Sequence, residues 1–409
     1  MNFLFIHQNF PAQFRHLANA LLEDPKNKVY AIGETNNVRT RGIIHKRIIL
    51  LGYQLELSKL FHQSVLGDFE IAAQRGQLVA GIALRLKNKG FYPDIIIAHP
   101  GWGETLFLKD IFPKSKHIYY FEFYYHAYGH DVGFDPEFPI STNERLLVRL
   151  KNTTQLLSLE SADEGIAPTH WQKQQYPVEF HSKIKVFHEG INTRLAAPNP
   201  EACFSYQNKT LTRDNEIITY VARNLEPYRG FHCLMRALPA ILEARPQAQI
   251  LIVGGDAVSY GRRLPNGQNY RELYLKELGH QLDLSRIHFV GKVSYRDFLT
   301  ILQVSSVHVY LTYPFVLSWS MLEAMSVGCA LVASETAPVK EVVLDGINGQ
   351  LVDFFNMRQL ADTVIAVLQN PDDYREMRFK ARQTIIDHYD LEQVCLPDWV
   401  RFVLHSRKE

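Results

Sequence analysis

The chain has 409 residues, of which 46% are hydrophobic and 21% are charged, and this composition excludes wholesale disorder and suffices for two large domains. Lys and Arg number 44 against 43 Asp and Glu, so no global positive field exists to drive nucleic-acid binding. The four cysteines form no C-x-x-C pair, which argues against a disulfide scaffold or a cysteine zinc site and favours a reducing compartment.

The N-terminal segment MNFLFIH has no basic n-region, so it is typical of a buried strand rather than of a signal peptide. No run of 18 apolar residues occurs anywhere in the sequence, and we therefore expect no bilayer-spanning helix. The expected location is the cytoplasm, and peripheral contact at the inner membrane face stays open.

Short apolar runs alternate with helical segments along the chain. In the first half a helical segment covers 13–22, and the runs are 3–6, 94–98, 117–125, 156–159 and 184–187. In the second half they are 217–222, 249–253, 287–290, 307–311 and 329–333. Continuous apolar runs indicate strands covered on both faces, and their alternation with helices predicts an α/β fold with parallel sheets.

The pattern pauses over 193–216, where prolines, asparagines and charges carry no apolar period, and we predict a linker there. It separates an N-terminal domain, 1–192, from a C-terminal domain, 217–385. Each is expected to be a Rossmann-like open sheet with its ligands beyond the carboxyl ends of the strands. The final segment, about 386–409, is predicted to be a helix that packs back on the N-terminal domain.

In the second half, a helix is predicted directly after the run 307–311. Ser318 or Ser320 can cap it and Gly328 can end it, and a helix N-terminus after a parallel strand favours an anion. Glu323 lies in this helix among apolar neighbours, so its carboxylate needs hydrogen-bond donors, and two sugar hydroxyls would serve. The alternative is a solvated helix glutamate.

Two cations flank the turn after the run 217–222. Arg223 ends the predicted strand and Arg229 precedes the next helix, so together they could clamp a diphosphate. The alternative is a pair of surface arginines. Gly254 and Gly291 end two further runs and would let the backbone approach a ligand.

The second half resembles the donor-binding domain of GT-B glycosyltransferases of family 4, a retaining group. The resemblance rests on VARNLEPYRGF, LIVGGD, FVGKVSYRDFLTIL, SMLEAMSVGCALVAS and PVKEVVLDGINGQLVD, in family order over 217–353. The first half is similar more loosely, through its opening strand and loop and the EGIN turn. The resemblance implies a GT-B fold, with two Rossmann-like domains whose parallel sheets face each other across a cleft.

The resemblance also implies roles in the donor site. Glu323 would hold the ribose hydroxyls of the nucleotide, and Arg223 and Arg229 would neutralise the donor diphosphate. The remaining donor-binding residues implied by the matching segments, together with an asparagine in the first loop, are Gly254, Gly291, Lys292, Val293, Leu317, Ser318, Ser320, Met321 and Asn9. The family usually has a Gly-rich turn where this chain has Asn9-Phe10-Pro11.

One position departs from the family pattern. The first glutamate of the E-x7-E motif would fall at residue 315, which is Phe315. A phenyl ring cannot accept a hydroxyl proton. Either the chain belongs to a subgroup that handles its donor sugar differently, or the site binds without efficient turnover.

In the first half, the segment HPGWGE follows the run 94–98. It places His99, Trp102 and Glu104 near the carboxyl end of a predicted strand, where a tryptophan beside polar groups suits a sugar. The alternative is a core histidine with a packing tryptophan. We take His99 as a candidate catalytic residue, and Trp102 and Glu104 as candidate acceptor-binding residues.

The stretch 119–138 is rich in tyrosine, phenylalanine, histidine and acidic residues. Glu122 would lie inside an apolar strand, where a lone carboxylate is costly, and we take it as a second catalytic candidate. His126, Asp131 and Asp135 are acceptor-binding candidates in the loop that follows, which could instead simply cover the sheet. Asp131 and Asp135, with the two histidines of the stretch, also resemble a metal cluster, but the resembling family normally uses no metal, and none is expected.

The predicted function is retaining transfer of a hexose-type sugar from a nucleoside-diphosphate sugar, with UDP as the default, to a hydroxyl on a glycan, a lipid-linked sugar or a protein. We expect the protein to act in polysaccharide biosynthesis, to use no cofactor and to bind no nucleic acid. Arg223 and Arg229 would stabilise the leaving diphosphate. The alternatives are a sugar-nucleotide epimerase and a nucleotide- or carbohydrate-binding protein without turnover.

Overall fold

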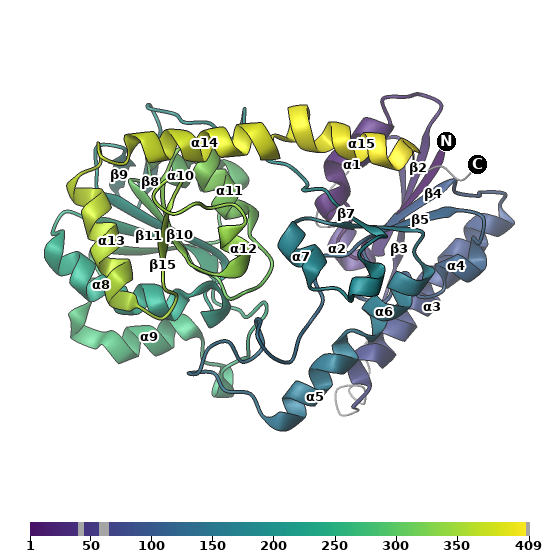
Figure 1. Cartoon of the computed structure of the whole chain (residues 1–409), viewed down its shortest axis with the longest axis horizontal. Coiled ribbons are helices and arrows are strands. Elements are labelled where there is room, and N and C mark those ends of the chain that lie inside the picture. The colour runs from purple at the N-terminus through teal and green to yellow at the C-terminus, as the bar shows by residue number, and fades with distance from the viewer. Residues whose placement is uncertain (40–44, 57–64, 406–409) are drawn as a thin grey trace. The chain divides into compact units, whose positions relative to one another are not determined.

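The computed structural model describes residues 1–39, 45–56 and 65–405 (Figure 1). The chain divides into two compact units. Unit 1 comprises Met1–Gly190 together with the chain from Glu392 onward, and unit 2 comprises Ile191–Leu391. Each unit is built on its own parallel sheet, so the α/β class predicted from the sequence is confirmed.

Unit 1 holds a seven-stranded sheet in the order β3-β2-β1-β4-β5-β6-β7, and all its strand pairs are parallel. The strands are β1 (Asn2–Ile6), β2 (Lys28–Glu34), β3 (Ile48–Tyr53), β4 (Ile95–Ala98), β5 (Lys116–Tyr120), β6 (Glu164–Ala167) and β7 (Ile184–Val186). Side chains of β1 alternate between two cores: Phe3 and Phe5 join one cluster, and Leu4 and Ile6 the other. Both faces are therefore buried.

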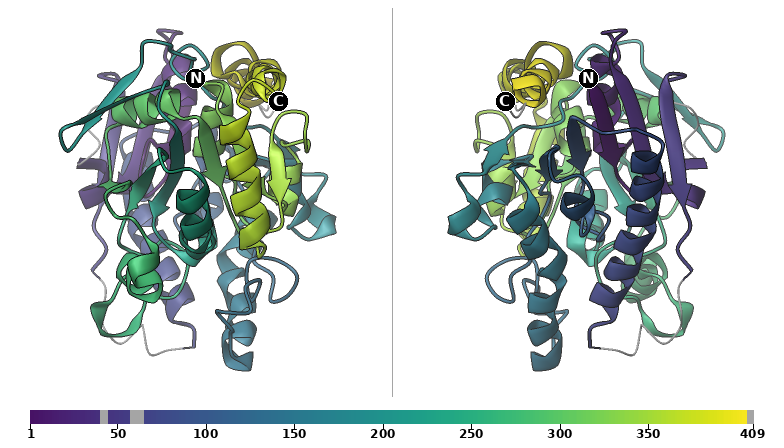
Figure 2. Two further views of the ribbon diagram at one scale, coloured as in Figure 1. Left: turned by 90° about the vertical axis from the view of Figure 1, so that its left-hand side faces the viewer. Right: turned by 90° about the vertical axis from the view of Figure 1, so that its right-hand side faces the viewer.

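Helices cover both faces of the unit 1 sheet (Figure 2). They are α1 (Arg15–Leu21), α2 (Thr35–Arg39), α3 (Gly67–Asn88), α4 (Leu108–Ile111), α5 (Thr142–Lys151), α6 (Thr153–Ser161), α7 (His170–Gln174) and α15 (Leu396–His405), with 3-10 turns at Ala12–Phe14 and Val178–Phe180. Helix α15 buries Trp399 and Val403 in the cluster that contains Phe14. The C-terminal helix thus packs within unit 1.

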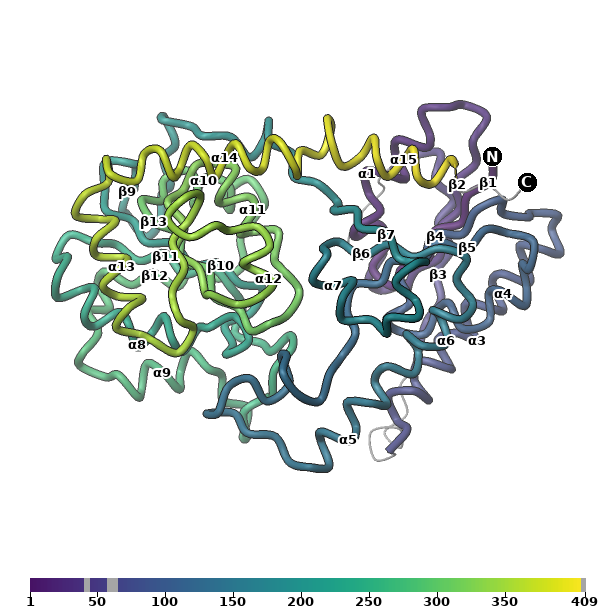
Figure 3. Tube along the Cα trace, in the orientation of Figure 1, coloured from purple at the N-terminus to yellow at the C-terminus, as the bar shows by residue number. Residues whose placement is uncertain are grey.

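Unit 2 holds a six-stranded parallel sheet in the order β12-β11-β10-β13-β14-β15. The strands are β10 (Ile217–Asn224), β11 (Gln249–Gly255), β12 (Ile287–Gly291), β13 (Val307–Tyr310), β14 (Ala330–Ser334) and β15 (Gln350–Val352). The helices are α8 (Phe231–Ala244), α9 (Tyr270–Leu278), α10 (Tyr295–Val304), α11 (Trp319–Ser326), α12 (Ala337–Lys340), α13 (Met357–Gln369) and α14 (Arg375–Tyr389). Figure 3 traces this alternation.

The segment predicted as a linker, 193–216, contains a β-hairpin. Strands β8 (Cys203–Tyr206) and β9 (Lys209–Thr212) pair antiparallel around Gln207 and Asn208, which both have positive φ, as a two-residue hairpin turn requires. Phe204 and Leu211 join a cluster with Ile217 and Leu251. The hairpin is therefore part of the unit 2 core.

Two other expectations fail locally. The run 156–159 lies in helix α6 rather than in a strand. The buried residues of this helix include Gln155, Ser158 and Leu159, which follow helical spacing. The strand predicted over 117–125 ends at Tyr120. Glu122 therefore lies beyond the strand and not inside it. None of the helices in the described ranges combines the length and the apolar character needed to traverse a bilayer.

Candidate functional site

The carboxyl ends of β10 and β13 lie side by side, because these parallel strands are neighbours in the unit 2 sheet. A short 3-10 turn, Pro227–Arg229, follows β10, and Gly230 then starts α8 with a φ of 65°. A Cβ at Gly230 would stand 2.3 Å from the Cβ of Leu311. Only a glycine lets the two loops approach this closely.

Arg229 is buried at this edge of the sheet. Its Nη1 donates hydrogen bonds to the hydroxyl of Tyr310 at 3.1 Å and to that of Thr312 at 2.8 Å. Burial lowers the pKa of Arg229, but the phenol oxygens of Tyr310 and Tyr260 outweigh this effect, and the net pKa is raised. Arg229 is therefore a fixed, permanently charged group, as binding of a diphosphate requires.

Arg223 is the last residue but one of β10 and is exposed. Its Cζ lies 5.9 Å from the centroid of the Tyr260 ring, and the Cζ of Arg229 lies 5.5 Å from the same centroid. The Tyr260 ring thus lies close to both guanidinium groups that the sequence analysis identified. The structure brings the two arginines together.

The loop that carries Tyr260 is held by a carboxylate. Glu226 is almost fully buried and accepts backbone N–H bonds from Ser259, Tyr260 and Gly261 at 2.9, 3.1 and 2.8 Å. Neither Glu226 nor Tyr260 was a sequence candidate. The signal for Glu226 lay in the segment LEPYRG, where a glutamate precedes proline between the two arginines.

Phe315, which replaces the first glutamate of the family motif, is buried among aromatic rings. Its ring centroid lies 4.9 Å from that of Tyr260, 5.5 Å from that of Tyr228 and 5.9 Å from the Cζ of Arg229. An apolar aromatic wall therefore stands beside the buried guanidinium where the family has a carboxylate.

Helix α11 begins after the loop that follows β13. Ser318 is its N-cap: its Oγ accepts the N–H of Ser320 at 3.3 Å, and its own N–H donates to the hydroxyl of Tyr310 at 2.9 Å. Of the two predicted caps, the structure selects Ser318. Leu317, Ser320 and Met321 are buried at the same helix start.

Glu323 is buried one turn inside α11. Its Oε1 accepts a hydrogen bond of 2.8 Å from the hydroxyl of Tyr295, the first residue of α10. Burial raises the pKa of Glu323 to about 7, and the Tyr295 hydrogen bond opposes the rise only in part. The environment is not that of a solvated helix glutamate.

Strands β11 and β12 of unit 2 end in glycines, and the space around these glycines differs. Gly254 is buried, and a Cβ there would meet Leu225 at 2.7 Å and the carbonyl oxygen of Ala222 at 2.9 Å. The need for glycine at this position is explained by packing. Gly291 has a φ of 75° and open space around it, while Lys292 is exposed and Val293 packs against the core.

In unit 1, His99 follows the end of β4 and is buried. Its Nδ1 accepts the N–H of Gly101 at 3.1 Å, so the proton lies on Nε2, which is 3.3 Å from Oε2 of Glu122. The ring of Trp102 stacks on His99, with centroids 4.3 Å apart. The structure thus brings three predicted residues together.

Glu122 itself is partly exposed and has a second partner. Its Oε1 accepts from the side-chain amide of Gln13 at 3.3 Å. Asn9, in the first loop, is half-buried, and its backbone N–H donates to Nδ1 of His7 at 2.8 Å. The loops after β1, β4 and β5 therefore contribute polar groups to one edge of the sheet.

Glu104 does not present a carboxylate to solvent. It is completely buried, accepts a 2.8 Å hydrogen bond from Tyr53 and lies 3.9 Å from Nε of Arg75. Burial raises the pKa of Glu104, and the charge of Arg75 opposes the rise. Glu104 therefore lies inside unit 1 between Tyr53 and Arg75, and its contact with an acceptor stays a prediction.

The remaining acceptor candidates lie in the long loop after β5. Nε2 of His126 is 2.8 Å from the carbonyl oxygen of Gln175, and the carboxylate of Asp135 accepts the N–H of Glu137 at 2.9 Å. Asp131 begins a turn in which its carbonyl accepts the N–H of Phe134. These contacts order the loop, and its role toward an acceptor stays a prediction.

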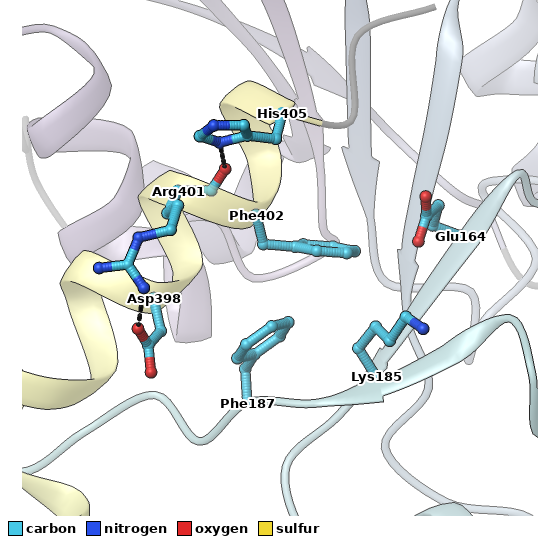
Figure 4. A pocket seen from close by; sticks show the side chains of 7 residues that line it. All are labelled: Glu164, Lys185, Phe187, Asp398, Arg401, Phe402 and His405. Atoms are coloured by element: carbon cyan, nitrogen blue, oxygen red, sulfur yellow. Dashed lines mark hydrogen bonds and ion pairs between the residues drawn. The ribbon is translucent and has the colours of Figure 1, made fainter.

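A separate hollow of about 390 Å³ lies in unit 1 between α15 and the strand pair β6–β7 (Figure 4). Three of the charged groups that line it are engaged in ion pairs: Arg401 pairs with Asp398 at 3.0 Å, and Glu164 pairs with Lys116 at 3.1 Å. The hollow is lined by none of the predicted site residues, so it is not part of the candidate site.

Two family models match the chain. A model described as "Glycosyl transferase family 4 group" matches residues 25–196, and one described as "Glycosyl transferases group 1" matches residues 204–384. The first lies almost wholly in unit 1 and the second in unit 2.

Among curated relatives, the phosphatidyl-myo-inositol mannosyltransferase of Mycobacterium tuberculosis is 31% identical over 191 residues, which is 45% of this chain and 46% of that protein. The D-inositol 3-phosphate glycosyltransferase of Mycolicibacterium smegmatis is 26% identical over 219 residues, 51% of this chain and 46% of that protein. The chain thus spans about half the length of these relatives.

Solved structures match over the whole chain. Anabaena HepE in complex with UDP and glucose has a TM-score of 0.66 at 18% identity, and covers 99% of this chain and 100% of its own. Sucrose-phosphate synthase from Thermosynechococcus elongatus has a TM-score of 0.73 at 20% identity with the same coverage. At these identities the likeness shows the fold, which is GT-B. Together with the two family models, which match residues 25–196 and 204–384, this fold identifies the chain as a GT4-type glycosyltransferase.

Proposed function

We propose that the protein is a retaining glycosyltransferase that moves a hexose-type sugar from a nucleoside-diphosphate sugar to a hydroxyl acceptor. The observation that carries the proposal is the immobilised Arg229, held by two hydroxyls at the carboxyl edge of the unit 2 sheet and joined there by Arg223. Arg229 precedes α8 and shares the Tyr310 hydroxyl with the α11 cap, and Arg223 lies near the end of β10. Two such permanent charges suit a diphosphate.

UDP is the proposed nucleotide. The structurally similar HepE has been crystallised with UDP and glucose, and also with UDP-glucose. Glu323 is the proposed partner of the ribose hydroxyls, which would add donors to the one that Tyr295 already supplies. The aromatic wall at Phe315 is proposed to meet the donor sugar where the family has a charged group.

In the proposed reaction, Arg223 and Arg229 stabilise negative charge as it develops on the leaving diphosphate. The acceptor hydroxyl attacks the face from which the diphosphate departs, and the departing phosphate oxygen takes the acceptor proton. His99 and Glu122 are proposed to orient the acceptor or the sugar. Because two arginines supply the charge neutralisation, we propose that transfer requires neither a metal ion nor a cofactor.

The acceptor is proposed to be a glycan, a lipid-linked sugar or a protein, in polysaccharide biosynthesis. The name of one relative includes phosphatidyl-myo-inositol, a membrane lipid, and this supports an acceptor presented at a membrane. We accordingly propose a cytoplasmic location with peripheral contact at the inner membrane face.

The test is a donor panel of UDP-, GDP-, ADP- and CMP-sugars, with nucleotide release as the measured quantity. Arg229→Ala and Glu323→Ala should weaken donor binding at least tenfold, a change of about 1.4 kcal/mol. The matched controls are Arg358→Ala and Glu376→Ala, at exposed positions in unit 2. If both site variants bind donor like the wild type, the proposed site is wrong.

The presence of Phe315 supports a second candidate function, in which the protein binds a nucleotide or a carbohydrate without turnover. That function predicts donor affinity without nucleotide release on any acceptor. A sugar-nucleotide epimerase would instead convert the donor alone, and NMR of the donor would reveal the new sugar.

A further inference from the structure

The helix pair α5–α6 in unit 1 buries Val148 and Leu159 but exposes its other leucines in part or largely. Leu146 is 67% exposed, and Leu147, Leu156 and Leu157 are 39%, 40% and 46% exposed; these four residues are called the leucine face below. A surface helix normally buries its apolar stripe and exposes its polar one. Four large exposed side chains on one helix pair exceed the scattered exposure that needs no explanation.

The buried positions of the same pair are mostly polar: Asn152, Thr154, Gln155 and Ser158. Asn152 clasps the backbone of Tyr125, accepting its N–H at 2.9 Å and donating to its carbonyl at 2.7 Å. The hydroxyl of Ser158 bonds that of Thr105 at 2.9 Å.

These bonds fix the rotation of the two helices. Turning the leucines inward would break them and would leave buried polar groups without partners, which costs more than leaving leucines in water. The tube trace shows α5 running directly into α6 (Figure 3). The hydrogen bonds of the buried polar residues therefore hold the leucines in their outward orientation.

The charges around the leucine face are mainly positive. Arg149 and Lys151 are exposed on α5, and Arg145 lies with its Cζ 4.6 Å from the ring centroid of the exposed Tyr128. The acidic residues of the pair are Glu144, which is engaged in the capping box with Ser141, and the exposed Glu160. Leucines beside arginine, lysine and an exposed tyrosine are typical of helices that lie in a lipid headgroup region.

We propose that the leucine face docks on an anionic lipid surface, with Arg149 and Lys151 on lipid phosphates and the leucines at the headgroup boundary. The proposal rests on the membrane contact proposed above and names the surface that makes it. A second copy of the chain fits less well, because a two-fold interface would bring Arg149 and Lys151 toward their own copies. An anionic surface complements the same charges.

The test is flotation of the full chain with vesicles of phosphatidylcholine alone or with roughly 30% phosphatidylglycerol, whose negative surface potential attracts basic segments. The wild type should bind the anionic vesicles and lose binding as salt is raised. Leu146→Gln with Leu157→Gln should reduce partitioning by more than about tenfold. Arg149→Gln with Lys151→Gln should reduce it by about fivefold for each cation removed.

The matched control is Leu195→Gln with Leu284→Gln in unit 2, where both leucines are more than half exposed; it should float like the wild type. The proposal is overturned if the wild type ignores anionic vesicles or if the leucine variant binds them unchanged. It is also overturned if the leucine variant only converts a dimer to a monomer, which would assign the face to a second copy.

Affinity for UDP, measured by calorimetry on the same proteins, separates this proposal from the proposed function. The leucine variant should retain wild-type affinity for UDP while losing the vesicles. A wild type that floats but does not bind any nucleotide would contradict the proposed function and leave the docking surface supported.

Discussion

Tyr295 donates a hydrogen bond of 2.8 Å to Oε1 of the buried Glu323. One neutral donor does not compensate fully for burial of a carboxylate, and the pKa of Glu323 is therefore raised to about 7, from an ordinary value of 4.5. Between these two pH values the folded state binds a proton that the unfolded state has released. The free energy of unfolding consequently falls as pH rises through this window, and the loss is complete above pH 7.

Glu323→Gln should therefore match the wild type in stability at pH 4 and exceed it by about 3 kcal/mol at pH 8. Urea unfolding at both pH values measures the difference. Glu376→Gln, at an exposed position on α14, is the control and should track the wild type. An equal gain at pH 4 and pH 8 would contradict the raised pKa.

The same carboxyl gives a second prediction, on donor binding. Sugar hydroxyls donate to a carboxylate better than to a protonated acid, so affinity for UDP-glucose should rise as pH passes through about 7. The donor itself does not titrate between pH 5 and 8. In Glu323→Gln the affinity should be weaker at pH 8 and flat across this range. Calorimetric titration at four pH values measures it, and a pH-dependent variant would count against Glu323 as the titrating group.

A third prediction concerns Glu226, which acts through another residue. Its carboxylate accepts three backbone N–H groups and so holds Tyr260 beside the two arginines. Glu226→Ala should leave these three N–H groups without their acceptor and destabilise the fold by about 1–3 kcal/mol. It should also raise the KM for the nucleotide-sugar more than it lowers kcat.

Tyr260→Phe provides the comparison for Glu226, because it keeps the ring and the loop while removing only the hydroxyl. Its KM should stay much closer to that of the wild type. A merely structural role for Glu226 would lower the amount of active enzyme and leave the KM of the folded fraction unchanged.

Several central strands were predictable from the sequence because both of their faces are buried, although β2 and β6, which are also central, were not predicted. Strands such as β4 and β13 consist wholly of buried residues, and a continuous apolar run marks them. The edge strand β3 exposes Ile49 and Leu50, and β15 has only three residues, so neither produced a clear run. Four-residue runs such as LLSL in α6 cannot be assigned to strand or helix by periodicity alone.

The site was predictable only in part, for a similar reason. Arg223, Arg229 and Glu323 lie in segments whose order matches a family, so residue type and spacing identified them. Tyr260 and Tyr295 meet those side chains from positions about 30 residues away in the chain, and no local pattern records such a contact. The effect of the Phe315 departure likewise depended on its neighbours, which only the fold brings together.

The contact of His99 with Glu122 yields the last prediction. The N–H of Gly101 fixes the proton of His99 on Nε2, so the neutral ring is aimed as a donor at the Glu122 carboxylate. Both residues belong to unit 1, whereas Arg223, Arg229 and Glu323, the residues proposed to bind the nucleotide, belong to unit 2. Glu122→Gln should thus lower kcat by about 100-fold, a typical loss for a positioned proton-transfer or orienting group, while the affinity for UDP stays unchanged. Glu164→Gln, a carboxylate of similar exposure in unit 1, is the control and should retain its kcat. Loss of UDP affinity in Glu122→Gln would assign Glu122 to the nucleotide rather than to the acceptor or the transferred sugar.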